Sequence, residues 1–392
     1  MRRNQAQAGI SGRSAQYRRN TGRAKQAEEL SGMARQEANR WWLVFTGSYT
    51  PADREGIETL LFDAERGELK RLAGCGGVAN SSYLAFDERR YVLYAVSEHG
   101  EGEVAALSVD RATGRLALIN RQPSHGRSPC YVCLEPDGSR VYVANYMGGN
   151  ASVYPVREDG GLLPASDTVQ HAGSGVRPDR QEAPHAHSIM SDPSGRYRIV
   201  CDLGIDRLMV YRTSPDGKFE PAGAIHTTPG GGPRHLAFHP SLPLLYLLEE
   251  LSSTVSVYAF DAERAAGELL QRVPMLPEDF KGANLAADIH LDPGGRWLYA
   301  SNRGHDSLAV YSVGPDGLLT FIGHAPTGRT PRNFVPVPDG RHLLVAAQDD
   351  NRIDVMRIGP DGMPAAVGEP YASAKPVCIV MTPAPPELVS AG

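Results

Sequence analysis

The sequence repeats one pattern at intervals of about 45 to 57 residues. Three copies are clear: "EPDGSRVYVANYMGGNASVYPVREDG" from 135, "DPSGRYRIVCDLGIDRLMVYRTSPDG" from 192 and "DPGGRWLYASNRGHDSLAVYSVGPDG" from 292. Each has a turn, an apolar strand with aromatic residues, a polar break and a second alternating strand that ends near a tyrosine. Weaker copies begin near Asp87, His239 and Pro338. This spacing is typical of the four-stranded blades of a β-propeller.

The two ends of the repeated region complete one another. "RWWLVFTGSYT" from 40 matches the second strand of a blade, and "GIETLLFDAERGEL" matches the third. The missing inner strand of that blade reappears as "KPVCIVMTP" at 375–383, which has the same form as "TPRNFVPVP". A blade built from both termini removes the free edges of an open sheet. The sequence therefore predicts an all-β fold, a single seven-bladed β-propeller over residues 41–384.

Positive charge is concentrated before the propeller. Residues 1–40 contain nine Lys/Arg and three Glu, although the whole chain has a formal net charge of −5. The remaining chain is therefore acidic, which argues against nucleic acid as a main partner. The basic segment has few large apolar residues, so we expect residues 1–40 to form a disordered extension and residues 385–392 a C-terminal tail.

The sequence contains no pattern that predicts export or membrane insertion. The basic start is not followed by the apolar core of a secretory signal, and no run approaches the roughly 18 apolar residues of a membrane span. We expect a cytoplasmic protein with no membrane partner. Its oligomeric state stays open between a monomer and a weak dimer.

Five cysteines do not indicate a disulfide framework. Cys130 and Cys133 form a C-x-x-C motif, but they lie inside the expected strand "SPCYVCLEP". Side chains three residues apart on a strand point to opposite faces, so we expect this pair to pack in the core instead of binding a metal.

Aligned copies place different polar residues at equivalent points of the blades. In a propeller, the start of each inner strand and the end of each second strand lie on one face, around the central channel. The second position of the inner strands holds Cys130, His187, Arg234, Ala287, Arg332 and Val377. The second strands end at Ser48, Ser97, Asn145, Asp202, Glu249, Asn302 and Ala347, followed by Tyr49, Glu98, Tyr146, Leu203, Glu250, Arg303 and Gln348. Different polar residues at equivalent positions of a regular repeat indicate a binding site at this mouth.

Three arginines in one cleft, Arg234, Arg303 and Arg332, predict an anionic small-molecule ligand, because guanidiniums pair with carboxylate or phosphate. We predict substrate-binding roles for Arg332, Asn302, Asp288 and Asn145. His235 and His290 lie beside or inside apolar runs, so structural hydrogen bonding is favoured for them. Asp192, Asp292 and Asp339 are expected to cap their own turns.

The stretch "PHAHS" at 184–188 allows metal binding as an alternative, because imidazoles at i and i+2 on a strand share a face. A third ligand beyond Glu250 or Asp288 is not obvious, and nearby arginines oppose a cation. We therefore expect no metal and no cofactor. The "PGGGP" loop at 229–233 lacks the G-K-[ST] that completes a phosphate-binding P-loop.

The order of several motifs resembles the seven-bladed lactonase propellers, which include propeller-type 6-phosphogluconolactonase and the fungal carboxy-cis,cis-muconate cyclase. The resemblance covers about Trp41 to Pro383 and is carried by "FTGSYT", "PHAHS", "GGGPRHLAFHP", "EELSSTVSVY", "AADIHLDPGGRWLYASNRG" and "TPRNF". It implies a metal-independent site in the channel mouth. Its catalytic residues would be His185 or His187 together with Arg234, Glu250 and Arg303.

The expected reaction is hydrolysis of a small anionic sugar lactone, with 6-phosphogluconolactone as the first candidate. In this interpretation Glu250 orients or deprotonates water, Arg234 and Arg303 stabilise the oxyanion, and His187 or His185 protonates the leaving oxygen. Arg332 would hold a distal phosphate or carboxylate. Two alternatives stay open, a lactonizing cyclase of the carboxymuconate type and a propeller that binds a ligand without catalysis.

Overall fold

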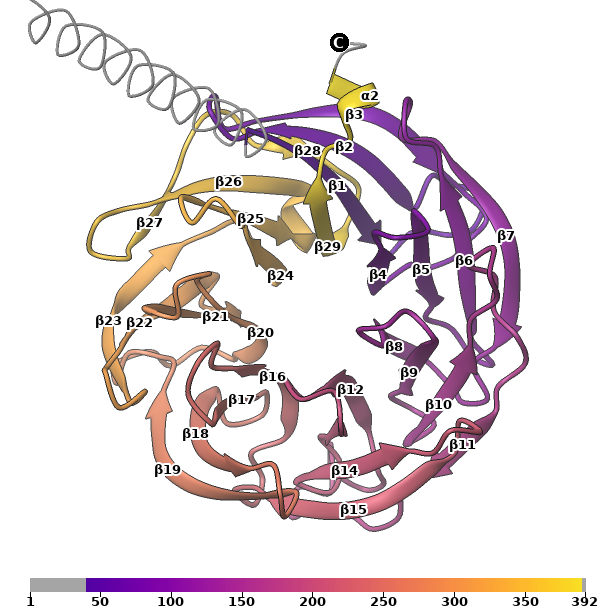
Figure 1. Ribbon diagram of the computed structural model, residues 1–392. Coiled ribbons are helices and arrows are strands. Elements are labelled where there is room, and N and C mark those ends of the chain that lie inside the picture. Colours follow the sequence, from indigo (N-terminus) through magenta and orange to yellow (C-terminus); the bar gives the residue numbers. More distant parts are fainter. Residues whose placement is uncertain (1–39, 390–392) are drawn as a thin grey trace, which may run out of the picture.

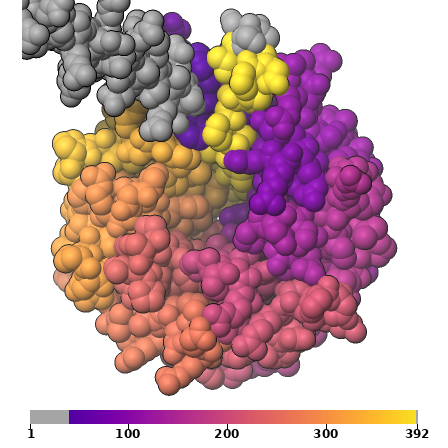
Figure 2. Space-filling model, viewed as in Figure 1, coloured from indigo at the N-terminus to yellow at the C-terminus, as the bar shows by residue number. Residues whose placement is uncertain are grey.

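The computed structural model describes residues 40–389, which form seven antiparallel sheets arranged in a ring (Figure 1). The predicted seven-bladed propeller is confirmed. The expected basic extension lies outside the described residues, apart from Arg40. On the face shown in Figure 2, the molecule is hollowed near the centre of the ring.

Each blade has four strands in order from the axis outward, and one blade carries a short fifth strand. The inner strands are β29 (Pro376–Pro383), β4 (Leu84–Asp87), β8 (Pro129–Leu134), β12 (Ala186–Ser191), β16 (Pro233–Phe238), β20 (Leu285–Leu291) and β24 (Pro331–Pro336). The second strands are β1 (Trp41–Ser48), β5 (Val92–Ser97), β9 (Arg140–Asn145), β13 (Arg198–Asp202), β17 (Leu244–Glu249), β21 (Trp297–Arg303) and β25 (His342–Ala347).

The outer half of each blade completes the sheet. The third strands are β2 (Ile57–Asp63), β6 (Glu103–Val109), β10 (Asn150–Pro155), β14 (Arg207–Thr213), β18 (Thr254–Asp261), β22 (Ser307–Val313) and β26 (Arg352–Ile358). The outermost are β3 (Glu68–Cys75), β7 (Leu116–Pro123), β11 (Asp167–Gln170), β15 (Phe219–His226), β19 (Ala266–Pro274), β23 (Leu319–Pro326) and β27 (Pro364–Ala366), with β28 (Tyr371–Ala372) also on β26. The short helices are η1 (Gln348–Asp350) and α2 (Pro386–Val389).

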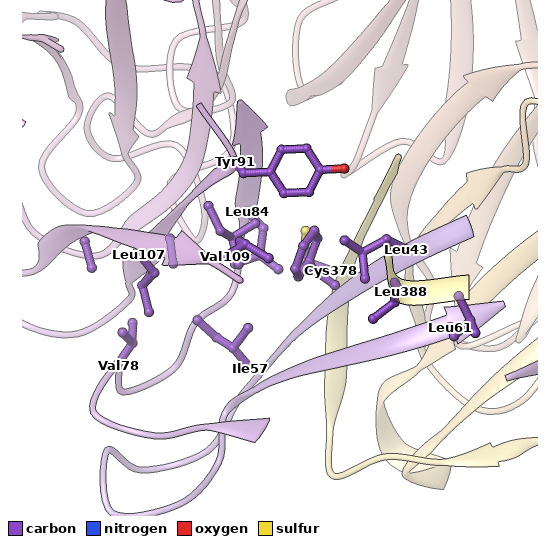
Figure 3. Packing of buried hydrophobic residues seen from close by; sticks show 14 residues of the cluster. Leu43, Ile57, Leu61, Val78, Leu84, Tyr91, Leu107, Val109, Cys378 and Leu388 are labelled. Atoms are coloured by element: carbon purple, nitrogen blue, oxygen red, sulfur yellow. The ribbon is translucent and has the colours of Figure 1, made fainter. Parts of the chain in front are cut away.

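The closing blade joins the two ends of the described chain, as the sequence predicts. Strand β29 pairs antiparallel with β1, so that Phe45 lies opposite Val380. Beyond β29, where we expect only a tail, α2 packs Leu388 into the core beside Leu43 and Leu61 (Figure 3). This packing adds apolar contacts across the junction of the two termini.

Neighbouring blades are held together by apolar side chains and by a recurring hydrogen bond. The apolar clusters lie between adjacent sheets; in one of them Leu248 and Val257 of one blade pack with Leu298 of the next. Tyrosine hydroxyls in the second strands donate to glycine carbonyls in a turn of the next blade: Tyr94 to Gly160, Tyr246 to Gly317 and Tyr299 to Gly362. The repeated tyrosine therefore connects blades as well as filling the core.

The turn aspartates cap their own turns, as predicted. The carboxylates of Asp192, Asp292 and Asp339 accept backbone N–H bonds from within their own turns, at distances of 2.6 to 2.8 Å. Cys130 and Cys133 lie on β8 and pack in one apolar cluster, which confirms the predicted packing role. Within residues 40–389, no helix is long and apolar enough to cross a membrane.

Candidate active site

A β-bulge at the start of the inner strands aims several side chains into the channel mouth. The ladder shifts register between Ala186 and Ser188, and again between Pro233 and His235. The residues skipped by these shifts are His187 and Arg234. A bulged residue is left out of the ladder and its side chain is redirected. Arg332 is skipped in the same way on β24.

Glu250 is the centre of the cluster that results. Its Oε2 atom lies 2.9 Å from Nε of Arg234 and 3.0 Å from Nη2 of Arg303. Its other oxygen, Oε1, accepts a 2.8 Å hydrogen bond from Nη2 of Arg180. The Glu250 side chain is only 4% exposed. A buried carboxylate thus binds three guanidiniums from three separate parts of the chain.

These contacts decide the protonation state of the cluster. Burial by itself raises the pKa of Glu250, but the charges of Arg303 and Arg234 and the hydrogen bond from Arg180 outweigh it and lower that pKa to about 2. At neutral pH Glu250 is therefore a carboxylate and a weak proton acceptor. Burial lowers the pKa of Arg303 to about 9 against the attraction of Glu250, so Arg303 still carries its charge at neutral pH.

His187 is the histidine that joins this cluster. Its Nε2 lies 3.7 Å from Oε2 of Glu250, and its Nδ1 lies 3.8 Å from Sγ of Cys130. Burial, followed by the positive charge of Arg234, holds the pKa of His187 well below its usual value. The imidazole is therefore neutral at neutral pH, and it can accept a proton.

His185 lies at the edge of the same mouth. Its ring stacks on Tyr146, with 4.6 Å between the ring centroids, and its Nδ1 lies 3.1 Å from the Tyr146 carbonyl oxygen. Its Nε2 faces Glu182 at 3.3 Å. The backbone N–H of His185 donates to Asp202, whose other oxygen is 2.5 Å from Nδ1 of the buried His171. This buried pair fixes the segment that carries both "PHAHS" imidazoles.

Sequence reasoning missed Arg180. This residue lies in the connection between β11 and β12, which has no counterpart of similar length in the other repeats. Besides Glu250, its Nη2 contacts the hydroxyl of Tyr146 at 3.2 Å. Its side chain is 30% exposed, the highest value among the three arginines that bind Glu250. A charged residue in an unusually long connection was the only signal in the sequence.

Two predicted substrate-binding residues do not reach the mouth. Asn145 and Asn302 are fully buried. Their amide groups donate to the backbone carbonyls of Ser124 and Met275. Successive strand residues point to opposite faces, so Asn145 and Asn302 turn into their blades and the residues that follow them, Tyr146 and Arg303, turn toward the channel. The structure therefore places both asparagine side chains inside their blades and not with the arginine cluster.

Asp288 is also placed away from the arginine cluster. Its carboxylate binds Nδ1 of His235 at 2.7 Å, Nε2 of His290 at 3.0 Å and the amide of Asn333 at 2.5 Å. With Phe238 and His290 it lines a separate cavity of about 330 Å³, formed largely by residues near the far ends of the inner strands. The structural hydrogen bonds predicted for His235 and His290 are present, and Asp288 is their partner.

The His235 ring links this buried network to the cluster, because its Nε2 lies 3.2 Å from Nη1 of Arg234. The same Nη1 atom donates to the Ala287 carbonyl. Arg234 is thus held on three sides and has little freedom to move. Among residues 40–389, no group of three or more His, Cys, Asp or Glu side chains is arranged to hold a metal ion.

Comparison with known proteins agrees with this architecture and covers nearly all of it. Residues 43–381 match the family described as "Lactonase, 7-bladed beta-propeller". The chain belongs to this lactonase family. Strands β1 to β29 all begin or end within the matched range, so the family assignment covers every blade, including the closing one.

Several lactonase-family relatives have names that refer to a reaction. The chain is 36% identical to a 6-phosphogluconolactonase of Bacillus subtilis over 299 residues, which is 75% of this chain and 84% of the relative. It is 34% identical to a 6-phosphogluconolactonase of Formosa agariphila, over 74% of this chain and 85% of the relative. The structure of a periplasmic gluconolactonase of Pseudomonas aeruginosa superposes with a TM-score of 0.83 at 33% identity, covering 88% of this chain and all of that one.

Proposed function

We propose that this lactonase-family protein hydrolyses a small anionic sugar lactone, with 6-phosphogluconolactone as the first candidate substrate and the cytoplasm as its location. The observation that carries the proposal is the Glu250 carboxylate bound by three guanidiniums beside a neutral His187. Relatives named for lactone hydrolysis support the same reaction.

The contacts favour different roles from those expected for Glu250 and the histidine. Glu250 has a pKa of about 2 and three cationic partners, so it anchors Arg180, Arg234 and Arg303 instead of deprotonating water. We assign the acceptance of the proton of the attacking water to His187, because its imidazole is neutral and its Nε2 lies 3.7 Å from a carboxylate that remains charged. The imidazolium that forms is stabilised by Glu250 and then donates the proton to the ring oxygen as the lactone opens.

The arginines supply charge where the transition state needs it. Attack on the lactone carbonyl places negative charge on its oxygen, and Nε of Arg303, which has no hydrogen-bond partner among the described residues, is available beside Arg234 to bind that charge. Arg180, the most exposed of the three arginines that bind Glu250, is available for the distal anion of the substrate. The mouth contains four guanidiniums and three carboxylates, Glu250, Glu98 and, at its edge, Glu182, which leaves an excess of positive charge.

The deciding assay adds purified protein to freshly prepared 6-phosphogluconolactone and, separately, to carboxymuconate. Acceleration of ring opening above the spontaneous rate supports the proposal. Turnover of carboxymuconate alone would replace it with the cyclase alternative. If neither compound turns over, both catalytic proposals fail, and the propeller that binds a ligand without catalysis is the interpretation that remains.

A further inference from the structure

The mouth contains a second cluster, formed by the closing blade and the blades on either side of it. Tyr49 follows β1, Glu98 follows β5, and Arg332 is the bulged residue of β24. The hydroxyl of Tyr49 donates to Oε2 of Glu98 at 2.9 Å. The guanidinium carbon of Arg332 lies 5.1 Å from the centroid of the Tyr49 ring, in a cation–π contact. All three side chains are half-buried and still reach solvent.

Glu98 differs sharply from Glu250, although the two occupy equivalent positions three blades apart. Glu250 is saturated by three guanidiniums. Within the described chain, the Glu98 carboxylate has one side-chain hydrogen bond, from Tyr49, and no cationic nitrogen within 4.0 Å. Arg332 likewise has no carboxylate at ion-pair distance among residues 40–389. An acceptor and a donor are therefore both available to a ligand in the mouth.

The three side chains offer the groups that a sugar ring requires. A carboxylate oxygen accepts hydrogen bonds from hydroxyl groups, a guanidinium donates to hydroxyl oxygens, and an aromatic face packs against the C–H groups between them. A bare phosphate at the same place would be repelled by Glu98. Burial raises the pKa of Tyr49 well above its ordinary value, so the phenol keeps its proton and holds Glu98 in place.

We propose that Tyr49, Glu98 and Arg332 form a subsite that binds the ring hydroxyls of a polyhydroxylated lactone. The inference rests on the proposed lactonase function and assigns substrate selection to this side of the mouth. A lactone without hydroxyl groups would displace water from the Glu98 carboxylate and offer no hydrogen bonds in its place. We therefore expect a lower kcat/KM for such a lactone.

The test compares kcat/KM for glucono-δ-lactone and δ-valerolactone, which share the ester ring and differ in hydroxyl groups. Glu98→Gln is close in shape to the native residue and Tyr49→Phe removes the hydroxyl that orients it. Either variant should lose about tenfold or more on glucono-δ-lactone and stay within about twofold on δ-valerolactone. Glu101→Gln, an exposed carboxylate on the adjacent loop, is the matched control and should change neither value.

Equal losses on both lactones, or no loss on either, would overturn the subsite. If the native protein hydrolyses neither compound, the lactonase proposal fails, and calorimetry tests the subsite separately. Gluconate should then bind more tightly than 5-hydroxypentanoate, and Glu98→Gln should remove that preference. Equal affinity of the native protein for the two hydroxy acids would reject the subsite.

Discussion

Two adjacent glutamates lie in different environments, because successive strand residues point to opposite faces. Glu249, the last residue of β17, is fully buried in its blade, where Oε2 accepts bonds from Thr254 and Arg272. Glu250, the next residue, faces the mouth. We expect Glu250→Gln to lower kcat by at least about tenfold, because a neutral amide cannot hold three guanidiniums together.

Glu249→Gln is the matched control for that change. It removes one charge one residue away, and it should lower the melting temperature while kcat stays near the native value. Steady-state kinetics and thermal unfolding of both variants check the prediction. A loss of kcat in Glu249→Gln that equals the loss in Glu250→Gln would mean that folding, and not the mouth, explains both effects.

The neutral state of His187 predicts the acid side of the pH–rate profile. In the proposed mechanism the imidazole acts as a base only when unprotonated, and its pKa lies well below the ordinary 6.5. We therefore expect kcat/KM to stay level from neutral pH to below pH 6.5 and to fall only at more acid pH. A general acid would give the opposite sign, with activity that rises as pH falls. His187→Asn should remove most of the activity. His185→Asn should still show the same fall of kcat/KM at acid pH.

At the scale of elements, the hydrogen bond from a second-strand tyrosine hydroxyl to a glycine carbonyl of the next blade should contribute measurably to the free energy of unfolding. Tyr246 is fully buried, and its hydroxyl donates to the Gly317 carbonyl at 2.9 Å. Tyr246→Phe keeps the ring but leaves that carbonyl without its donor, so we expect a loss of about 1 to 3 kcal/mol in the free energy of unfolding. Denaturant unfolding measures it.

Tyr371→Phe is the control for the loss of a tyrosine hydroxyl. Its hydroxyl contacts Glu58 at a partly exposed site, so water can replace the bond and the cost should be small. Similar losses in the two variants would show that the blade-to-blade bond contributes no special stability.

The repeat explains why the sequence predicts the blades so well and the site only in part. A regular pattern of turns and alternating strands fixes the position of each inner and second strand, and so also places His187, Arg234, Glu250 and Arg303 in one mouth. The pattern does not say which of two adjacent columns faces the channel, so the burial of Asn145 and Asn302 inside their blades could not be read from it. Arg180 could not be found by alignment, because its connection has no equivalent in the other blades.

At the scale of the whole molecule, the charge of the mouth is opposite to the acidic charge of the remaining chain. A formal net charge of −5 makes the molecule as a whole repel anions, whereas Arg180, Arg234, Arg303 and Arg332 concentrate positive charge at one end of the channel. A local field of this kind attracts an anionic substrate over a distance of about 8 Å at physiological ionic strength.

This field predicts that ionic strength changes kcat/KM for an anionic lactone more than for a neutral lactone. Raising the ionic strength should lower kcat/KM for 6-phosphogluconolactone several-fold, because its phosphate is attracted to the arginines, and should leave the neutral glucono-δ-lactone almost unchanged. Arg332→Gln should weaken that salt dependence without abolishing turnover of the neutral lactone. Initial rates at several salt concentrations, corrected for spontaneous hydrolysis, measure both effects. Equal salt dependence for the two lactones would show that the mouth selects its substrate through short-range contacts alone.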